Sequence, residues 1–174
     1  ALLTLAATPT LLVSRVSRTN HEILTVILPA YEAVRHAGAA MERRLSAAHS
    51  AFITGAPEED SLRLASRAEE AAALGVLRLH APRLSAVAEF RVLALQRLAL
   101  RRDSLERVLR WLPEPLATYP VALTRFDVIT DSMQLQLDGL RGDLLAATTA
   151  RFRNEMAWAS RWRVVAGLLG LVAA

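Results

Sequence analysis

Residues 53–60, ITGAPEED, divide two long stretches of helix-forming sequence. Gly55 suits the left-handed position that commonly ends an α-helix, and Pro57 suits the first turn of the next helix. The three acidic residues that follow Pro57 fall where negative charge favours the positive end of the helix dipole. The stretch therefore predicts two helices joined by a short turn.

Two further breaks complete the division of the chain. One surrounds Pro82 in LHAPRL (79–84), and the other is WLPEPLATYP (111–120), which contains three prolines. Apolar and polar residues do not alternate in the period-two pattern of a half-buried strand. We therefore predict an all-α protein with a kink or restart at Pro29. Its four helices are expected at residues 14–54, 58–80, 83–112 and 115–163.

Apolar residues recur every three or four positions within each predicted helix, which is the spacing of a seam between near-parallel helices. The first helix carries Ile23, Ile27, Ala30, Val34, Ala37, Met41, Leu45, Ala48 and Phe52. The second, interrupted by Glu69, carries Leu62, Ala65, Ala72, Val76 and Leu79, and the third carries Leu95, Leu98, Leu105, Leu109 and Leu112. The fourth carries Phe126, Ile129, Met133, Leu137, Leu140, Leu144 and Ala147. If alternate helices run in opposite directions, their lengths nearly cancel along the axis. We therefore expect an antiparallel up-down four-helix bundle.

Both ends of the chain are apolar. Residues 1–13 and 164–174 are each shorter than the roughly twenty residues that a membrane-spanning helix needs. We interpret them as the end of one transmembrane helix and the start of another, both truncated and continuous with the long first and fourth helices. This interpretation places residues 14–163 outside the cytoplasm, as the bundle of a two-pass protein of the inner membrane.

Composition and motifs narrow the function. The chain has no Cys, which excludes disulfides and a cysteine nucleophile. Its net charge of +4 is spread along the sequence, unlike the basic stripe of a nucleic-acid-binding protein. The four histidines lack the spacing of metal ligands, and the sequence has no GxSxG, HExxH or phosphate-binding glycine loop. We therefore expect no catalysis within this segment, no cofactor, no metal site and no nucleic-acid partner.

The helix ending formed by Phe52, Ile53, Thr54 and Gly55, within a helical segment between two apolar ends, resembles the third class of CHASE-type extracellular sensor domains. More loosely, the layout is similar to the four-helix-bundle input domains of bacterial chemoreceptors. The chain departs from the family pattern at Ala56 and Pro57, where an acidic residue is usual. The resemblance implies a sensory domain, usually of a histidine kinase whose cytoplasmic output domain lies on the same chain, and it offers no catalytic residues.

Candidate functional residues lie on the third and fourth helices. Arg97, Arg101 and Arg102 could present a patch to an anionic ligand. The alternative is a solvated helix face, because Asp103 with Arg107, and Glu106 with Arg110, have the i, i+4 spacing of weak surface ion pairs.

We expect a membrane-bound parallel homodimer with an unidentified ligand. A stimulus would displace the fourth helix, whose seam from Phe126 to Leu144 would transmit the signal across the membrane. The alternatives are the input domain of a methyl-accepting chemotaxis receptor and a structural helical membrane protein that senses nothing.

Overall fold

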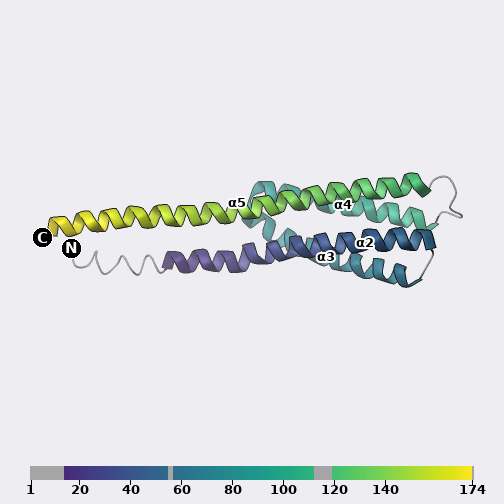
Figure 1. Ribbon diagram of the computed structural model, residues 1–174, viewed down its shortest axis with the longest axis horizontal. Coiled ribbons are helices and arrows are strands. Elements are labelled where there is room, and N and C mark those ends of the chain that lie inside the picture. The colour runs from purple at the N-terminus through teal and green to yellow at the C-terminus, as the bar shows by residue number, and fades with distance from the viewer. Residues whose placement is uncertain (1–13, 55–56, 112–118, 174) are drawn as a thin grey trace.

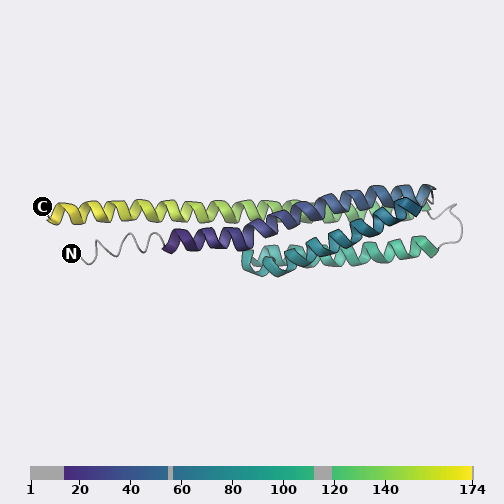
Figure 2. The same ribbon diagram turned by 90° about the horizontal axis from the view of Figure 1, so that it is seen from below.

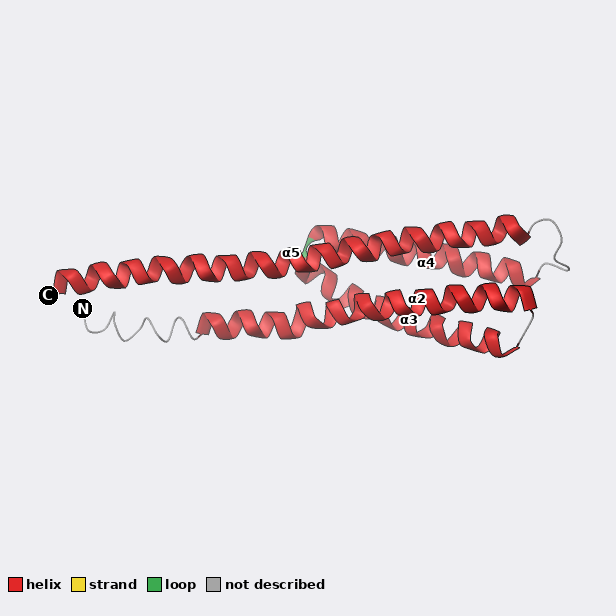
Figure 3. Cartoon of the chain, viewed as in Figure 1, coloured by secondary structure: helices red, strands yellow, loops and turns green. Residues whose placement is uncertain are grey.

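The computed structural model describes residues 14–54, 57–111 and 119–173. Every residue in these ranges is helical except Ser85, and they contain no strand (Figure 3). The prediction of an all-α protein with four helices is confirmed. After helical residues 14–22, the elements are the π-helix η1 (Ile23–Ile27) and the α-helices α2 (Leu28–Thr54), α3 (Pro57–Leu84), α4 (Ala86–Trp111) and α5 (Tyr119–Ala173).

The helices form an elongated bundle (Figure 1). α2 contacts α3 and α5, and α4 also contacts α3 and α5, so the four helices enclose a common interior. The junction between α3 and α4 lies about halfway along the molecule (Figures 1 and 2). Among the described residues, two helical segments continue beyond that junction: residues 14–22 and the C-terminal half of α5 (Figures 1 and 2).

The π-helix accounts for the expected irregularity at Pro29. The Leu28 N–H donates to the carbonyl of Ile23, five residues back, which is the wider π-helical hydrogen bond. Thr25 Oγ1 donates to the His21 carbonyl at 2.7 Å. Because Pro29 has no N–H to continue the α-helical pattern, a wide turn directly before it keeps the first helix connected.

The predicted break at Pro82 is wrong by a few residues. α3 includes Pro82 and ends at Leu84, and α4 begins at Ala86. Ser85 marks the boundary because its Oγ accepts a hydrogen bond from the Ala88 N–H at 3.0 Å, the geometry of a helix N-cap. Pro82 lies in the last turn of α3, so the hydrogen bond that its missing N–H removes, to the carbonyl four residues back, is near the end of the helix.

The other two predicted breaks agree with the helix bounds. α2 ends at Thr54 and α3 begins at Pro57, so ITGAPEED does separate two helices. α4 ends at Trp111 and α5 begins at Tyr119, four residues later than expected. Pro120 then lies in the first turn of α5, where a missing N–H costs no helical hydrogen bond.

The predicted seams of the first and fourth helices form the core. Ile27, Ala30, Val34, Ala37, Met41 and Ala48 are buried on the first helix. Phe126, Met133, Leu137, Leu140 and Leu144 are buried on α5, with Ile129 partly buried. On α4, Leu95 and Leu109 are buried, while Leu98 and Leu105 are partly buried. Phe52 and Leu112 lie outside the residues whose side chains are described.

The predicted seam of α3 is wrong, because that helix is rotated. Leu62, Val76 and Leu79 are exposed, by 48%, 39% and 69% respectively. The face that points inward instead carries Arg63, Ser66, Glu70, Ala73, Leu74, Leu77 and Ala81. Three of these seven inner-face residues are polar, and the regular apolar stripe faces outward.

The predicted membrane segments receive no structural support. Within the described ranges, no helix has an apolar stretch long enough to cross a bilayer. Residues 1–13 lie outside those ranges. Residues 164–173 continue α5 as helix.

Candidate functional site

The interior contains a cluster of charged side chains between α2, α3 and α4. Its five central members are at most 3% exposed, and we call them, with the three charged residues at their edge, the charge cluster. The central members are Arg44, Arg63, Glu70, Arg102 and Glu106. The edge members are Asp60, Arg67 and Asp103. With four arginines and four carboxylates, the cluster as a whole is neutral.

Arg44 lies at the centre of the cluster and links three helices. Its Nε donates to Glu106 Oε1 at 2.8 Å, its Nη1 to Glu70 Oε2 at 3.3 Å and its Nη2 to Asp103 Oδ1 at 2.5 Å. Burial by itself would lower the pKa of the Arg44 guanidinium, but its bonds to Glu106 and Asp103 and the charge of Glu70 outweigh burial and raise it. Arg44 is therefore a cation whose nitrogens all meet carboxylates.

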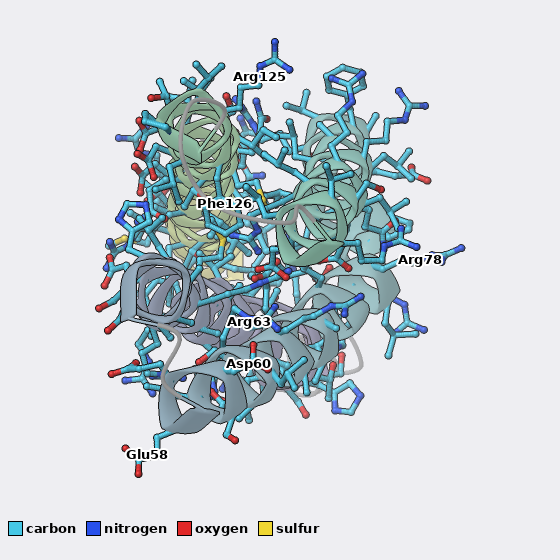
Figure 4. All side chains as sticks on the ribbon, turned by 90° about the vertical axis from the view of Figure 1, so that its right-hand side faces the viewer. Glu58, Asp60, Arg63, Arg78, Arg125 and Phe126 are labelled. Carbon is cyan, nitrogen blue, oxygen red and sulfur yellow. The ribbon has the colours of Figure 1, made fainter. Side chains whose placement is uncertain are left out.

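Arg63 on α3 is equally well paired. Its Nε and Nη2 donate to Asp60 Oδ1 at 3.0 and 2.7 Å, and its Nη1 donates to Glu106 Oε2 at 2.7 Å. Viewed along the bundle, Arg63 lies between the helices whereas Glu58 points away from them (Figure 4). Glu106 thus joins Arg63 of α3 to Arg44 of α2.

Asp103 joins the edge of the cluster to its centre. Besides Arg44, it accepts two bonds from Arg67, at 2.7 and 3.1 Å. Burial acts to raise the pKa of the Asp103 carboxyl, but the bonds and charges of Arg44 and Arg67 outweigh burial and lower it. Asp103 is therefore ionised at neutral pH.

Arg102 is less well paired than the other two buried arginines. Its Nη2 donates to Glu70 Oε2, while its Nε and Nη1 are buried without a hydrogen-bond partner among the described residues. The guanidinium lies over the Phe126 ring, with Cζ 5.7 Å from the ring centroid. Burial, together with the nearby charge of Arg44, lowers the pKa of Arg102, although Glu70 and Glu106 act in the opposite direction. Phe126 points into the bundle toward this region (Figure 4).

The three arginines predicted to bind an anion do not form one patch. Arg97 and Arg101 are exposed, whereas Arg102 is fully buried. The alternative, a solvated face, is also wrong for Asp103 and Glu106, because their carboxylates bond to arginines of α2 and α3. Arg107 instead donates to the backbone carbonyl of Asp103 at 3.4 Å.

Sequence reasoning missed the charge cluster, although a signal was present. Arg44 falls three residues after Met41 and four before Ala48, so it continues the apolar seam of the first helix. Glu106 similarly falls three residues before Leu109. Charged residues that occupy core positions of a heptad-like stripe are candidates for buried pairing.

The predicted signal-transmitting seam lies against α2 and α4. A Cβ on Gly38 of α2 would lie 4.0 Å from Leu137 Cδ1, so these two helices are in van der Waals contact. On the other side, Arg91 of α4 lies over Gly139 and donates to Asp143 Oδ2 at 2.9 Å.

The family-like turn motif is only partly described. Thr54 is the last residue of α2, and the side chains of Phe52 and Ile53 and all of Gly55 lie outside the described set. The structure therefore gives the position of this helix ending without its side-chain contacts.

The end of the molecule opposite the cluster is held by polar contacts. Arg15 Nε and Thr19 Oγ1 both donate to Glu155 Oε1 at 3.1 Å, and Arg151 Nη2 donates to Glu22 Oε1 at 2.8 Å. Arg15 also lies over the Trp158 ring, 4.8 Å from its centroid. These contacts join residues 14–22 to α5 below the four-helix region.

An open groove of about 800 Å³ runs between α2 and α3 on the outside of the bundle. Four of its eleven lining residues are alanine, and Arg43 and Glu69, which form an ion pair, also line it. Among the side chains that the structure describes, no three His, Cys, Asp or Glu are grouped to hold a metal ion.

Comparison with protein-family models, curated proteins and solved structures gives no match for this chain. The resemblance to the third class of CHASE-type domains therefore stays a prediction.

Proposed function

We propose that this chain is the extracytoplasmic input domain of a bacterial transmembrane receptor, a sensor histidine kinase of a two-component system. The proposal includes an antiparallel up-down bundle that joins two transmembrane helices, with the cytoplasmic output domain on the same chain. The observation that carries it is the length of α5, 55 unbroken residues and therefore about 80 Å. One rigid helix can connect events at the charge cluster to the apolar C-terminal end.

The contacts of α5 change along its length in a way that suits such a role. Between Phe126 and Leu144 its inner face is buried in the apolar core. Beyond the α3–α4 junction, partly exposed pairs such as Arg15 with Glu155 hold it. Since exposed ion pairs contribute only about 0–1 kcal/mol each, this end of α5 can shift at low cost. A stimulus that favours a second packing of the core would move it relative to the first helix.

The proposal also includes a parallel homodimer, and the outer face of α3 is the surface that fits one. Its stripe, Leu62, Ala65, Glu69, Ala72, Val76 and Leu79, has the alternating three- and four-residue spacing of a coiled-coil seam. The small residues at its centre permit close approach of a second helix. Glu69 at the middle of the stripe pairs with Arg43 of α2, so its charge is already matched within the chain where a second copy would pack. We therefore assign a second copy of this chain to this face.

The dimer can be tested apart from the signalling role. Val76→Glu places a charge in the stripe, and Val128→Glu places the same charge on the exposed face of α5. We expect sedimentation to show fewer dimers for Val76→Glu only. Equal association of both variants would rule out the α3 face.

The signalling proposal is tested by locking α2 to α5. Because these 174 residues contain no Cys, Gly38→Cys with Leu137→Cys introduces the one Cys pair of this segment, at a point where the helices touch. In the intact receptor, oxidation should fix autophosphorylation at one level with and without stimulus, and reductant should restore the response. The two single variants control for the substitutions themselves. Unchanged regulation in the oxidised double variant would contradict displacement of α5.

The same experiment on the intact product can favour either of two alternative functions. An intact product that modulates a chemotaxis kinase without being phosphorylated itself would favour a methyl-accepting chemotaxis receptor. A product without any output activity would favour a structural helical membrane protein.

A further inference from the structure

A second groove, of about 480 Å³, lies on the outside of the bundle between α4 and α5. Its lining includes four aliphatic side chains and two arginines, which are Leu105, Val108, Val128, Ile129, Arg101 and Arg125. Val108 and Val128 are 56% and 58% exposed. The groove is therefore an apolar surface that is open to solvent and has positive charge on both walls.

The two arginines are available to a ligand. Arg101 belongs to α4 and Arg125 to α5, and neither guanidinium bonds to another of the described residues. Their sequence neighbours Arg102 and Phe126 are buried, whereas Arg101 and Arg125 are exposed. Arg125 accordingly extends away from the bundle while Phe126 points into it (Figure 4). Each helix thus places one positive charge on its outer side.

The acidic side chains of the same two helix segments, residues 101–108 and 124–129, are bonded elsewhere. Asp103 and Glu106 accept hydrogen bonds from arginines inside the bundle. Asp127 Oδ1 lies 2.8 Å from His49 Nε2. No carboxylate is among the described residues that line the groove, so its positive charge is not neutralised locally.

The other polar side chains of the lining are those of Ser104 and Thr124. Their hydroxyl groups donate to carbonyls one turn back in their own helices, at 3.0 and 2.8 Å respectively. A ligand therefore meets mainly aliphatic side chains and the two guanidinium groups. This combination suits a molecule with an apolar body and one negative charge.

From these observations we infer that the groove between α4 and α5 binds a medium-chain aliphatic carboxylate. Its alkyl chain covers the four aliphatic side chains, because burial of apolar surface is favourable. Its carboxylate accepts hydrogen bonds from the guanidinium groups of Arg101 and Arg125. Between Arg101 and Val108, α4 rises by about 10 Å, which is close to the extended length of octanoate.

The groove between α2 and α3 is larger but does not select for negative charge. It is lined by two arginines and two glutamates, and Arg43 and Glu69 among them form an ion pair. The combination of an apolar floor with unpaired positive charge is thus a property of the groove between α4 and α5.

This inference goes beyond the receptor proposal and does not depend on it. It keeps Arg101 from the anion-binding patch expected from the sequence and adds Arg125 of α5. Arg97 does not line the groove, and Arg102 is buried on the other side of α4.

Isothermal titration calorimetry of the purified chain with octanoate tests the inference, at concentrations below those at which octanoate forms micelles. Three further probes separate the charge from the chain. Acetate has the carboxylate without the chain, octanol has the chain without the charge, and octyltrimethylammonium has the opposite charge. We expect one saturable site for octanoate and at least tenfold weaker binding of the other three.

Substitutions locate the site. Arg101→Gln and Arg125→Gln should each weaken octanoate binding at least threefold, and the double variant should weaken it at least tenfold. Val128→Glu places a negative charge on the floor and should abolish binding. Arg97→Gln and Leu135→Glu are the matched controls, because both positions are exposed on the same helices without lining the groove. All five positions are exposed, so we expect every variant to fold, which circular dichroism checks.

Three results would overturn the inference. Unchanged affinity in the double arginine variant would mean that octanoate binds elsewhere on the protein. Equal affinity for octanol would mean that the arginines do not recognise the carboxylate. Lack of saturable binding by the wild-type protein would exclude the ligand, and fewer dimers of Val128→Glu in sedimentation would then assign the groove to a second copy.

The result is separable from the receptor proposal. Octanoate binding that leaves autophosphorylation of the intact receptor unchanged would make the groove a ligand site without a signalling role. A failed disulfide lock with intact octanoate binding would remove the receptor proposal alone.

Discussion

The two halves of the four-helix interior are built on different principles. Nearest the α3–α4 junction, the interior is apolar and contains Leu77, Val92, Leu140 and Leu144. Toward the other end, the space between α2, α3 and α4 is occupied by the charge cluster. Apolar side chains need only fill the available volume, so they tolerate sliding and repacking. A guanidinium bonded on three sides is held in one orientation, because its hydrogen bonds are directional.

The two halves of the interior therefore contribute differently to the stability and the specificity of the bundle. Burial of apolar surface supplies stability at about 25 cal/mol per Å². Buried ion pairs contribute little net stability, because desolvation offsets their attraction, yet removal of one partner is costly. We therefore expect the apolar half to hold the helices together and the charge cluster to fix which faces meet.

The largest effect should come from removing one carboxylate of the cluster. Glu70→Ala leaves Arg44 short of one acceptor and Arg102 without any, so the free energy of unfolding should fall by about 3–5 kcal/mol. Glu69→Ala, one residue earlier, removes an exposed pair with Arg43 and should cost at most about 1 kcal/mol. Urea unfolding of both variants measures the difference. Similar losses for the two neighbours would mean that the cluster is solvated.

A cavity in the apolar half should cost nearly as much. Leu140 is 1% exposed, and Leu140→Ala should lower the free energy of unfolding by about 2–4 kcal/mol. Leu145→Ala, at a position 58% exposed, should change it by less than about 0.5 kcal/mol. Calorimetric or urea unfolding checks both values. A small loss at Leu140 would show that this half repacks to fill the space.

Acid should weaken the charged half first. Because Arg44 and Arg67 lower the pKa of Asp103, its stabilising contribution is present above the unfolded value of about 3.9 and is lost as pH falls through the lower folded value. Asp103→Asn should cost about 1–2 kcal/mol at neutral pH, and the deficit should shrink below about pH 4. Stability of the two proteins measured from pH 7 to pH 2 tests this. The stability loss caused by Leu140→Ala should stay constant from pH 7 to pH 2. If that loss also shrank at low pH, the acid sensitivity could not be attributed to Asp103.

The smallest effects concern two glycines of α5, three residues apart. A Cβ at Gly142 meets no atom of the described residues within 4 Å, so Gly142→Ala should raise the free energy of unfolding by about 0.5–1 kcal/mol. A Cβ at Gly139 would lie 2.4 Å from Arg91 Nη1, so Arg91 would have to withdraw from Asp143. Gly139→Ala should therefore gain nothing or lose slightly. Thermal unfolding of both variants distinguishes them, and equal gains would show that Arg91 is not held at Gly139.

The sequence predicted the apolar half far better than the charged half. Seam residues such as Met133 and Leu137 are recognisable because burial of one helix face requires a period of about 3.6. For α3 the same reasoning chose the wrong face, because Leu62, Val76 and Leu79 form a more regular stripe than the inner face. Arg63, Ser66 and Glu70 look like surface residues when their partners are unknown.

The charge cluster depends on contacts that local sequence patterns do not contain. Within α4, Asp103 and Glu106 have arginines four residues later, and these local pairs suggest a solvated face. Their actual partners, Arg44 and Arg63, lie about forty to sixty residues earlier and meet them only after the bundle has formed. Arg102 was a candidate for anion binding from sequence, but it lies on the buried face of α4, whereas Arg97 and Arg101 are exposed.

The π-helix at Ile23–Ile27 sets the rotational phase of the segment before it. A π turn holds about one residue more than an α turn, so residues 14–22 are turned by roughly 100° about the axis compared with an uninterrupted helix. Arg15, Thr19 and Glu22 owe their orientation toward Glu155 and Arg151 to that extra residue. The wide turn thus works as an angular offset between two stretches of one helix, and conversion of this turn to α-helix would swing those three side chains away from α5.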